Sequence, residues 1–211
     1  MSAFTVGISG GSGAAYALRL IEMLLRSDEQ VKVIVSPAGE KILELECDVR
    51  LTGTLMDKQS QLRDVLRIGK TEVGLELFDH KNVAAPISSG SFPSAGTVIV
   101  PCSMGTLGRI ANGISSDLIS RVADVALKER RKLILVPRET PLSEIHLKNM
   151  LAITQAGGTV MPAMPGFYHR PTRIADLVDM IVSRILDHLG IDSSIFERWK
   201  GEGVSKFLME E

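Results

Sequence analysis

The chain has 211 residues and a formal net charge of −1, because 24 basic side chains nearly balance 25 acidic ones. This balance excludes the strongly basic surface of a nucleic-acid-binding domain and gives no sign of a patch for an anionic membrane. No window holds the ~20 apolar residues that span a bilayer, and the first residues lack a signal-peptide pattern, so we expect a soluble, cytoplasmic protein.

Short apolar runs with β propensity alternate with helical patterns along the chain. The predicted strands cover residues 4–9, 31–36, 97–101, 133–137 and 159–162, and helical patterns follow them to about residues 26, 46, 131, 155 and 189. Nearly continuous apolar strands between helices predict a parallel sheet covered on both faces, which is an α/β architecture. No linker or repeat divides the chain, so we expect a single domain over 1–211 with a C-terminal tail from about residue 190.

A glycine turn, "SGGSG", lies between the first predicted strand and helix. Such a turn exposes backbone N–H groups at a helix start, where an anion binds favourably. The dinucleotide fingerprint fails because its third glycine would fall on Tyr16, and the next strand ends in Ser36 instead of an acid. A nucleophile elbow around Ser12 also fails, since Ala14 replaces its last glycine. The turn therefore predicts a mononucleotide or other phosphate ligand, with simple helix packing as the alternative.

A second candidate turn, "PCSMGT", follows the strand at 97–101. Ser103 and Thr106 are three residues apart at a helix start, so two hydroxyls and several N–H groups can converge on one anion. An ordinary helix N-cap is the alternative. Two such turns at neighbouring strand ends favour one ligand that bridges both.

Positive charge is concentrated between residues 121 and 138, where six basic residues face two acidic ones. We assign residues 130–132 to solvated helix faces. Arg138, by contrast, directly follows a buried strand, beside Glu139, and so belongs to the ligand edge of the sheet. Arg184 lies at the margin of the apolar stripe of the last helix, where it either extends to solvent or binds a phosphate.

The chain closely resembles the UbiX-type flavin prenyltransferase family, of the homo-oligomeric flavin-containing cysteine decarboxylase superfamily, over almost its whole length. The resemblance rests on the blocks "SGGSGAAYALRL", "SSGSF", "PCSMGTL", "RVADVALKERRKLILVPRETPL", "IHLKNM" and "MPAMPGFYHRP". It implies a Rossmann-like or flavodoxin-like three-layer sandwich, FMN as the bridging ligand, and trimers assembled into dodecamers. An assembly of this kind would account for a hydrophobic share of 45%, which is high for a soluble chain.

The resemblance also implies the site residues. The FMN contacts would be Gly10, Gly11, Ser12, Ser36, Ser103, Met104, Gly105, Thr106 and Arg138. The second substrate, dimethylallyl monophosphate, would contact Tyr168, Arg184, Lys128, Arg121, Ser89 and Gly90. The catalytic group would be Ser12, Glu46, Lys128 and Glu139. The chain departs from the family in having Gly11 where alanine is usual and Cys47 where threonine is common.

The implied reaction joins a dimethylallyl group to N5 and C6 of reduced FMN and releases phosphate. Ser12 and Glu46 would relay a proton near N5, Glu139 would position basic groups or the phosphate, and the product would pass to a UbiD-type decarboxylase. No aspartate-rich motif for Mg²⁺ is present, so cationic side chains would stabilise the leaving phosphate without a metal.

Three other functions stay open at this stage: a flavin-dependent cysteine decarboxylase of the same superfamily, an aromatic acid decarboxylase subunit, and a non-catalytic FMN carrier. The non-catalytic alternative for Ser12 is a helix cap, and that for Glu46 is a solvated carboxylate at a helix end.

Four other residues attract attention without indicating a function. Cys102, like Cys47, stands outside any metal-ligand spacing, so neither a disulfide framework nor a zinc site is expected. Trp199 is predicted to pack in the core or an interface. His146 and His169 have no partner that the sequence identifies.

Overall fold

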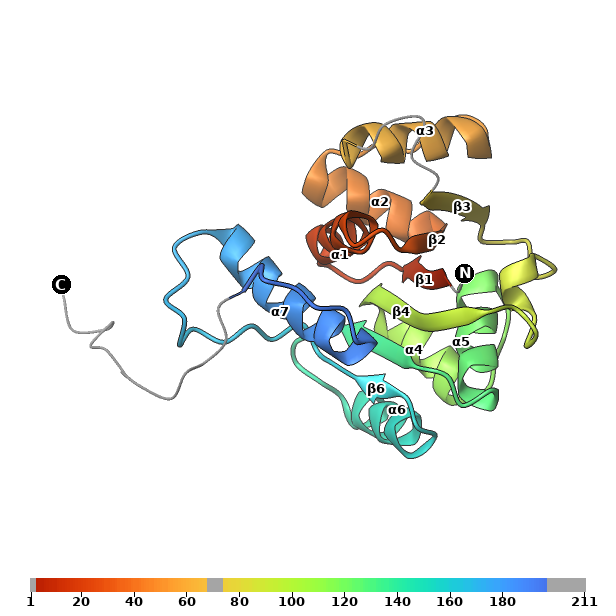
Figure 1. The fold of residues 1–211 in the computed structure, drawn as a ribbon. Helices are drawn as coiled ribbons and strands as arrows, with labels where there is room; N and C mark the ends of the chain where they lie inside the picture. The colour runs from red at the N-terminus through yellow and green to blue at the C-terminus, as the bar shows by residue number, and fades with distance from the viewer. Residues whose placement is uncertain (1–2, 68–73, 197–211) are drawn as a thin grey trace.

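The computed structural model describes residues 3–67 and 74–196, and it contains one sheet of six parallel strands. The strands are β1 (Ala3–Ile8), β2 (Gln30–Val35), β3 (Leu75–Asp79), β4 (Ser94–Cys102), β5 (Leu133–Pro137) and β6 (Thr159–Val160). Their order across the sheet, β3-β2-β1-β4-β5-β6, is that of the Rossmann fold (Figure 1). The predicted α/β class with a parallel sheet is confirmed.

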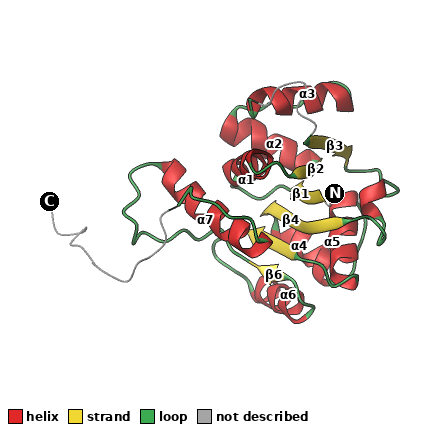
Figure 2. Cartoon of the chain, viewed as in Figure 1, coloured by secondary structure: helices red, strands yellow, loops and turns green. Residues whose placement is uncertain are grey.

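Helices cover both faces of this sheet (Figure 2). Their bounds are α1 (Ala14–Arg26), α2 (Pro37–Cys47), α3 (Leu55–Val65), the short 3-10 helix η1 (Pro86–Ser88), α4 (Met104–Ala111), α5 (Leu118–Lys128), α6 (Glu144–Gln155) and α7 (Ile174–Leu189). One hydrophobic core joins the sheet to α1, α2, α3 and α7, and a second joins it to α4, α5 and α6. The result is a three-layer sandwich.

The alternation of side chains along the strands explains the two cores. In β2, Val33 and Val35 belong to the core beneath α1, whereas Ile34 belongs to the core beneath α5. In β4, Val98 and Ile99 divide in the same way. Because neighbouring residues of a strand point to opposite faces, a strand buried on both sides must be apolar throughout.

Besides the short 3-10 helix η1, two elements were not predicted from the sequence, α3 and β3. Helix α3 is mostly polar and buries Leu62, and a capping box fixes its start, with Thr54 accepting from the N–H of Asp57 at 3.2 Å. Strand β3 has only five residues and lies at the edge of the sheet. A polar helix and a short edge strand both lack the strong apolar periodicity on which the prediction relied.

The assignment of residues 130–132 to solvated helix faces was partly wrong: Arg130 is exposed as expected, but none of the three residues lies on a helix, and Arg131 and Lys132 bind backbone carbonyls. Helix α5 ends at Lys128, before these residues. Arg131 donates to the carbonyl oxygens of Gly90 at 2.5 Å and Phe92 at 2.8 Å, and Lys132 donates to that of Leu189 at 2.8 Å. These side chains tie loops to the amino end of the sheet.

The predicted C-terminal tail is described only as far as residue 196, so Trp199 lies outside the described residues. Within the described ranges, none of the helices combines the length and apolar character needed to cross a bilayer.

Gly39 provides a test of how closely α2 packs against β1. A Cβ at this position would lie 2.4 Å from the carbonyl oxygen of Ile8, which the sheet holds in place. We expect Gly39→Ala to lower the free energy of unfolding by about 1–3 kcal/mol, measured by urea denaturation. Gly105→Ala is the control, because no atom lies within 4 Å of the added Cβ. Equal stability of the two variants would contradict the close packing.

Candidate functional site at the carboxyl edge of the sheet

The turns that follow β1, β2 and β4 pack directly against one another. A Cβ on Gly11 would lie 3.3 Å from the backbone of Cys102 and Ser103, and a Cβ on Gly10 would lie 2.6 Å from the Cβ of Ala38. Glycine at position 10 therefore lets the β1–α1 turn lie against the start of α2, and the small residue at position 11 lets it lie against the end of β4. The strand order reverses between β1 and β4, and ligands of such sheets bind in the crevice at this switch point.

Ser9, which the sequence analysis missed, joins the ends of β1 and β4. Its hydroxyl donates to the carbonyl oxygen of Pro101 at 2.9 Å and accepts from the N–H of Ser103 at 2.8 Å. The residue is only 2% exposed. A serine at the end of an otherwise apolar strand was the available signal, since a buried hydroxyl needs partners.

The predicted turn at the start of α4 has the expected hydroxyl pair. The Ser103 hydroxyl accepts from the N–H of Thr106 at 3.2 Å and donates to the Thr106 hydroxyl at 3.0 Å. Met104 is buried beside them, whereas no atom lies within 4 Å of a Cβ built on Gly105. The N-cap alternative is thus correct for Ser103. The Ser103 cap leaves the start of α4 accessible at Gly105, so this helix start can be capped by Ser103 and bind an anion at the same time.

Ser36 is also an N-cap, because its hydroxyl accepts from the N–H of Gly39 at 3.0 Å at the start of α2. Its position after β2 places it at the same edge as the glycine turn. The structure therefore brings all the predicted FMN contacts to the ends of β1, β2, β4 and β5.

The carboxylate of Glu46 reaches from the end of α2 to the start of α1. One oxygen accepts from the N–H groups of Gly13 and Ala14, both at 2.8 Å. Burial raises the pKa of Glu46, but hydrogen bonds from Ser12 and these two N–H groups, with the charge of Arg138, outweigh it and lower the pKa below its usual value. Glu46 is therefore ionised near neutral pH, and although the residue is exposed, its carboxylate is bound to the start of α1.

Tyr168 and Arg184 form a second group. Both line a cavity of about 570 Å³, all of whose lining residues come from 159–196. The Tyr168 ring packs edge-to-face on the rings of His169 and Phe196, with centroids 5.7 and 6.3 Å apart. Arg184 forms an ion pair with Asp187 at 3.3 Å.

Lys128, Ser89 and Gly90 form a third group at the opposite edge of the sheet. Gly90 and Ser89 precede β4, and Lys128 ends the helix that leads to β5, so all three lie near the amino ends of the strands. Lys128 pairs closely with Glu129, and a Cβ on Gly90 would lie 2.9 Å from the Lys128 Nζ atom. One chain thus does not bring these residues together with the FMN group.

The remaining predicted residues have ordinary local contacts. Arg121 pairs with Asp124 on α5 at 3.1 Å, and the Glu139 carboxylate accepts from the N–H of Thr140 at 3.1 Å. His146 caps α6 by accepting from the N–H of Ser143 at 3.2 Å. Both ring nitrogens of His169 are buried, and neither has a hydrogen-bond partner among the described residues.

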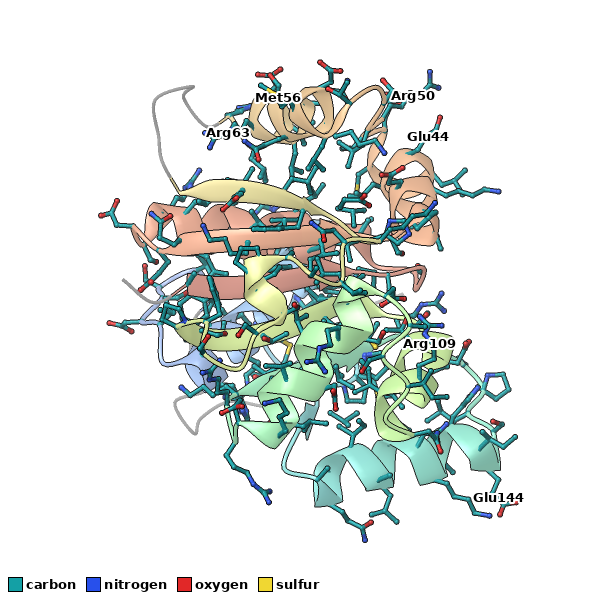
Figure 3. The ribbon with its side chains drawn as sticks, turned by 90° about the vertical axis from the view of Figure 1, so that its right-hand side faces the viewer. Glu44, Arg50, Met56, Arg63, Arg109 and Glu144 are labelled. Carbon is teal, nitrogen blue, oxygen red and sulfur yellow. The ribbon has the colours of Figure 1, made fainter. Side chains whose placement is uncertain are left out.

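Arg109 is a further residue that the sequence analysis missed. It lies on α4, and its guanidinium donates to the Thr106 hydroxyl at 3.1 Å and pairs with Asp117 at 3.3 Å. Its Nε atom is buried without a partner in the described part of the chain. In Figure 3 it lies toward the same side as Glu144, the first residue of α6, which is the side of the strands' carboxyl ends.

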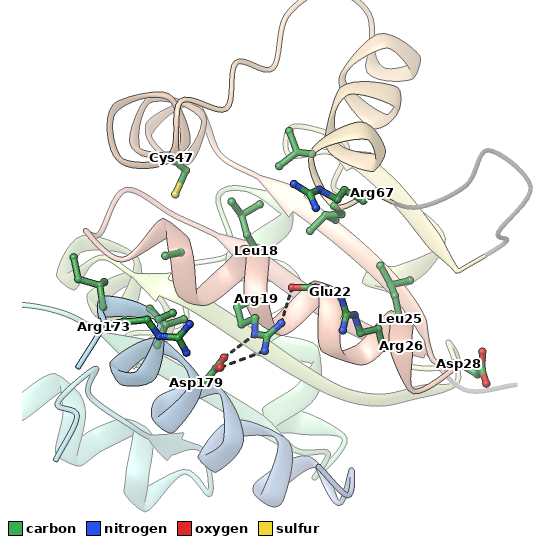
Figure 4. A pocket seen from close by; sticks show the side chains of 16 residues that line it. Leu18, Arg19, Glu22, Leu25, Arg26, Asp28, Cys47, Arg67, Arg173 and Asp179 are labelled. Atoms are coloured by element: carbon green, nitrogen blue, oxygen red, sulfur yellow. Dashed lines mark hydrogen bonds and ion pairs between the residues drawn. The ribbon is translucent and has the colours of Figure 1, made fainter. Parts of the chain in front are cut away.

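A larger cavity of about 970 Å³ lies between α1, α7 and the end of α3, and none of its lining residues is a predicted site residue (Figure 4). Some of its charged groups pair with one another: Arg19 donates to Asp179 at 2.7 Å and to Glu22 at 2.9 Å. The Arg19–Asp179 pair connects α1 with α7. The turns after β1, β2 and β4 therefore remain the candidate ligand site.

Neither cysteine forms a disulfide, and Cys102 is fully buried, which raises the pKa of its thiol to about 12. Among the described residues, no cluster of three His, Cys, Asp or Glu side chains is arranged to hold a metal ion.

This chain is similar in sequence and in fold to proteins of known family. Residues 2–186 match the model of the Flavoprotein family. The flavin prenyltransferase UbiX of Alkalihalophilus pseudofirmus is 46% identical over 195 residues, which make up 92% of this chain and 94% of that protein.

Two solved structures are also similar. AnUbiX (PadA1) in complex with FMN and dimethylallyl pyrophosphate has a TM-score of 0.84 at 40% identity, over 96% of this chain and 99% of that one. A dodecameric FMN-dependent UbiX-like decarboxylase from Escherichia coli O157:H7 has a TM-score of 0.80 at 36% identity, over 94% and 99% of the two chains.

The parallel sheet, the two turns at its switch point and the match over most of the chain define a flavoprotein. Within that class, the chain belongs to the UbiX family of flavin prenyltransferases.

The residues at the carboxyl edge fit the FMN that this family implies. Gly11 brings two turns into contact, the space at Gly105 is open, and Arg109 keeps a buried donor that no described residue satisfies. Hydroxyls, backbone N–H groups and a guanidinium are the donors that a phosphate monoester requires.

Glu46 provides a test of the site's electrostatics. We expect Glu46→Gln to lower the free energy of unfolding at pH 7 by roughly 1 kcal/mol, at the low end for charged hydrogen bonds because the carboxylate is partly exposed. A group with a lowered folded-state pKa stabilises the protein above its unfolded-state pKa of about 4.3, and this stabilisation disappears as the pH falls through the folded-state value. Urea titrations of both proteins between pH 7 and pH 3 measure the difference; a difference that stays constant would contradict the assignment.

Proposed function

We propose that the protein is a metal-independent flavin prenyltransferase that joins the dimethylallyl group of dimethylallyl monophosphate to N5 and C6 of reduced FMN and releases phosphate. The observation that carries the proposal is the convergence of the two ligand turns with Ser12, Glu46 and Arg138 at the switch point. Membership of the UbiX family supports the same reaction.

The two helix starts at the switch point favour different groups. Glu46 already accepts hydrogen bonds from the start of α1, so that end is neutralised. The start of α4 has Ser103, Thr106 and an open position at Gly105, and its dipole favours an anion. We therefore place the FMN phosphate at α4, with Gly10, Gly11, Ser12 and Ser36 beside the rest of the molecule. Reduced FMN, when bound, supplies the electron-rich N5 and C6 atoms that accept the five-carbon group.

The residues of this chain would bind and stabilise the leaving phosphate. Arg184 and Tyr168 line one cavity and supply a guanidinium and a hydroxyl, and Lys128 supplies an ammonium group. Positioned cations stabilise the charge that develops on a phosphate as it departs, which is the role that Mg²⁺ has in other enzymes. Met161, Met164 and Met180 line the same cavity and offer an apolar surface to the dimethylallyl group.

Ser12, Glu46 and Glu139 would act on protons and orientation. A carboxylate with a lowered pKa is a weak base at neutral pH, so the contribution of Glu46 is first to hold the Ser12 hydroxyl. A relay near N5 would then pass through Ser12, which both donates and accepts. Glu139, beside Arg138, would hold basic groups or the phosphate in position.

An assembly of several copies would complete the site. Lys128, Ser89 and Gly90 lie at the amino edge of the sheet, so they reach an FMN at the carboxyl edge only from another copy of the chain. Helix α6 exposes Ile145, Leu147 and Leu151, an apolar face that suits burial between subunits. We propose a dodecamer, each chain a single domain over residues 1–211, located in the cytoplasm and delivering prenylated FMN to a UbiD-type decarboxylase.

The direct test is to incubate the purified protein anaerobically with reduced FMN and dimethylallyl monophosphate, without added metal, and to measure the mass of the extracted flavin. We expect a gain of one C5H8 unit. Arg184→Ala should slow its formation on the order of 10²-fold, because a donor to the leaving phosphate is lost. Arg26→Ala is the matched control, since Arg26 pairs with Glu22 on α1, outside the proposed site. The pyrophosphate donor is assayed in parallel. Unmodified FMN, recovered bound with either donor, would contradict the proposal and favour the FMN carrier or decarboxylase.

The origin of Lys128 is tested by mixing two inactive variants. Lys128→Ala and Arg138→Ala chains are refolded or co-expressed together, so that some sites combine the intact Arg138 of one chain with the intact Lys128 of another. With random mixing we expect about a quarter of the wild-type rate, since heterologous contacts pair different patches of two copies. No recovery in a verified mixed oligomer would show that both residues serve one site from the same chain.

A further inference from the structure

Arg109 lies over the first turn of α4, although it is six positions after the cap residue Ser103. Helical side chains point back toward the helix N-terminus, which explains how its guanidinium reaches Thr106. The Nη2 atom donates to the Thr106 hydroxyl at 3.1 Å. Arg109 therefore brings a positive charge to the helix start at which we place the FMN phosphate.

The contacts of Thr106 fix the direction of its hydroxyl proton. Its oxygen accepts one hydrogen bond from the Ser103 hydroxyl at 3.0 Å and another from Arg109 at 3.1 Å. A hydroxyl has two acceptor positions and one proton. With both acceptor positions filled, the remaining function of the Thr106 hydroxyl is to donate, which is what an anion at this turn requires.

The Arg109 guanidinium keeps capacity for another partner. Its carboxylate partner, Asp117, is shared: one oxygen caps α5 by accepting from the N–H and the hydroxyl of Ser120, both at 2.8 Å. The other oxygen is 3.3 Å from Arg109. The Nε atom is buried and has no partner in the described part of the chain. The side chain as a whole is 37% exposed, so a ligand at the turn can approach the exposed part of the guanidinium.

We infer that Arg109 is a positioning residue for the phosphate of FMN, which orients the Thr106 hydroxyl toward it and adds positive charge at the start of α4. The inference rests on the proposed function, since it assumes that FMN binds at this turn. It predicts that Arg109 determines the preference for FMN over riboflavin, which has the same ring system and ribityl chain but no phosphate.

The experiment compares Arg109→Ala with the wild-type protein in equilibrium binding of FMN and of riboflavin, followed by quenching of flavin fluorescence. We expect FMN affinity to fall about tenfold or more, because a charge-assisted contact is lost, while riboflavin affinity is unchanged. Arg109→Lys should recover part of the FMN affinity, because it keeps the charge without the planar guanidinium. Arg26→Ala is the control that removes an arginine elsewhere and should change neither affinity.

A second variant separates this role from a purely structural one. Asp117→Asn keeps a residue that caps α5 but removes the carboxylate that pairs with Arg109, so FMN affinity should stay the same or rise. Equal losses of FMN and riboflavin binding in Arg109→Ala, or a loss of FMN binding in Asp117→Asn, would overturn the inference in favour of a tie between α4 and α5. If the wild-type protein binds neither flavin, the proposed flavin site itself fails, and the inference with it.

Discussion

The close contact between the β1–α1 turn and the end of β4 is the constraint on which the rest of the structure depends. Gly11 lies against the backbone of Cys102 and Ser103, and Ser9 joins the same two strand ends through a buried hydroxyl. Because the winding of the sheet reverses between β1 and β4, this contact lies at the switch point where we propose that FMN binds. An added Cβ at position 11 would lie 3.3 Å from this backbone, so the alanine that is usual in the family fits after a small shift. A side chain larger than alanine would push the two turns apart.

The charges at this crevice are divided between its two helix starts. Glu46 accepts from the start of α1, and its lowered pKa keeps it negative near neutral pH. The start of α4 has no acidic residue in its first turn, and Arg109 adds positive charge there. In the proposed site, the carboxylate that stabilises α1 would direct the FMN phosphate to α4, since an anion avoids the neutralised end. The Glu46 carboxylate would thus both stabilise the start of α1 and determine which helix start binds the FMN phosphate in the proposed site.

The cationic groups for the second substrate are distributed differently. Arg184 lies with Tyr168 in a cavity near β6 and α7, whereas Lys128 lies at the amino edge of the sheet beside Gly90. A parallel sheet keeps its two edges apart by the length of its strands, so a single chain does not bring Lys128 to the proposed FMN contacts at the carboxyl edge. In the proposed oligomer, a neighbouring copy would supply Lys128 to the site, and contact between copies would bury the exposed apolar face of α6.

The sequence by itself determined the α/β class, the order of the main strands and helices, the two ligand turns and the family. Apolar strands between helices and the glycine and serine turns are local patterns, and local patterns can be read without coordinates. Helix α3 and strand β3 escaped prediction because a polar helix and a short edge strand have weak periodicity. Arg131 and Lys132 were misassigned because a hydrogen bond to a distant carbonyl leaves no local pattern.

Only the tertiary structure decided which predicted residues meet. It placed Glu46 on the start of α1, joined Ser9 to β4, introduced Arg109 beside Thr106, and separated Lys128 from the FMN group. Each of these facts depends on contacts between segments, or on the direction of a side chain, that the order of residues does not specify. The sequence determines which chemical groups are present. The distances between those groups depend on how the helices pack against the sheet.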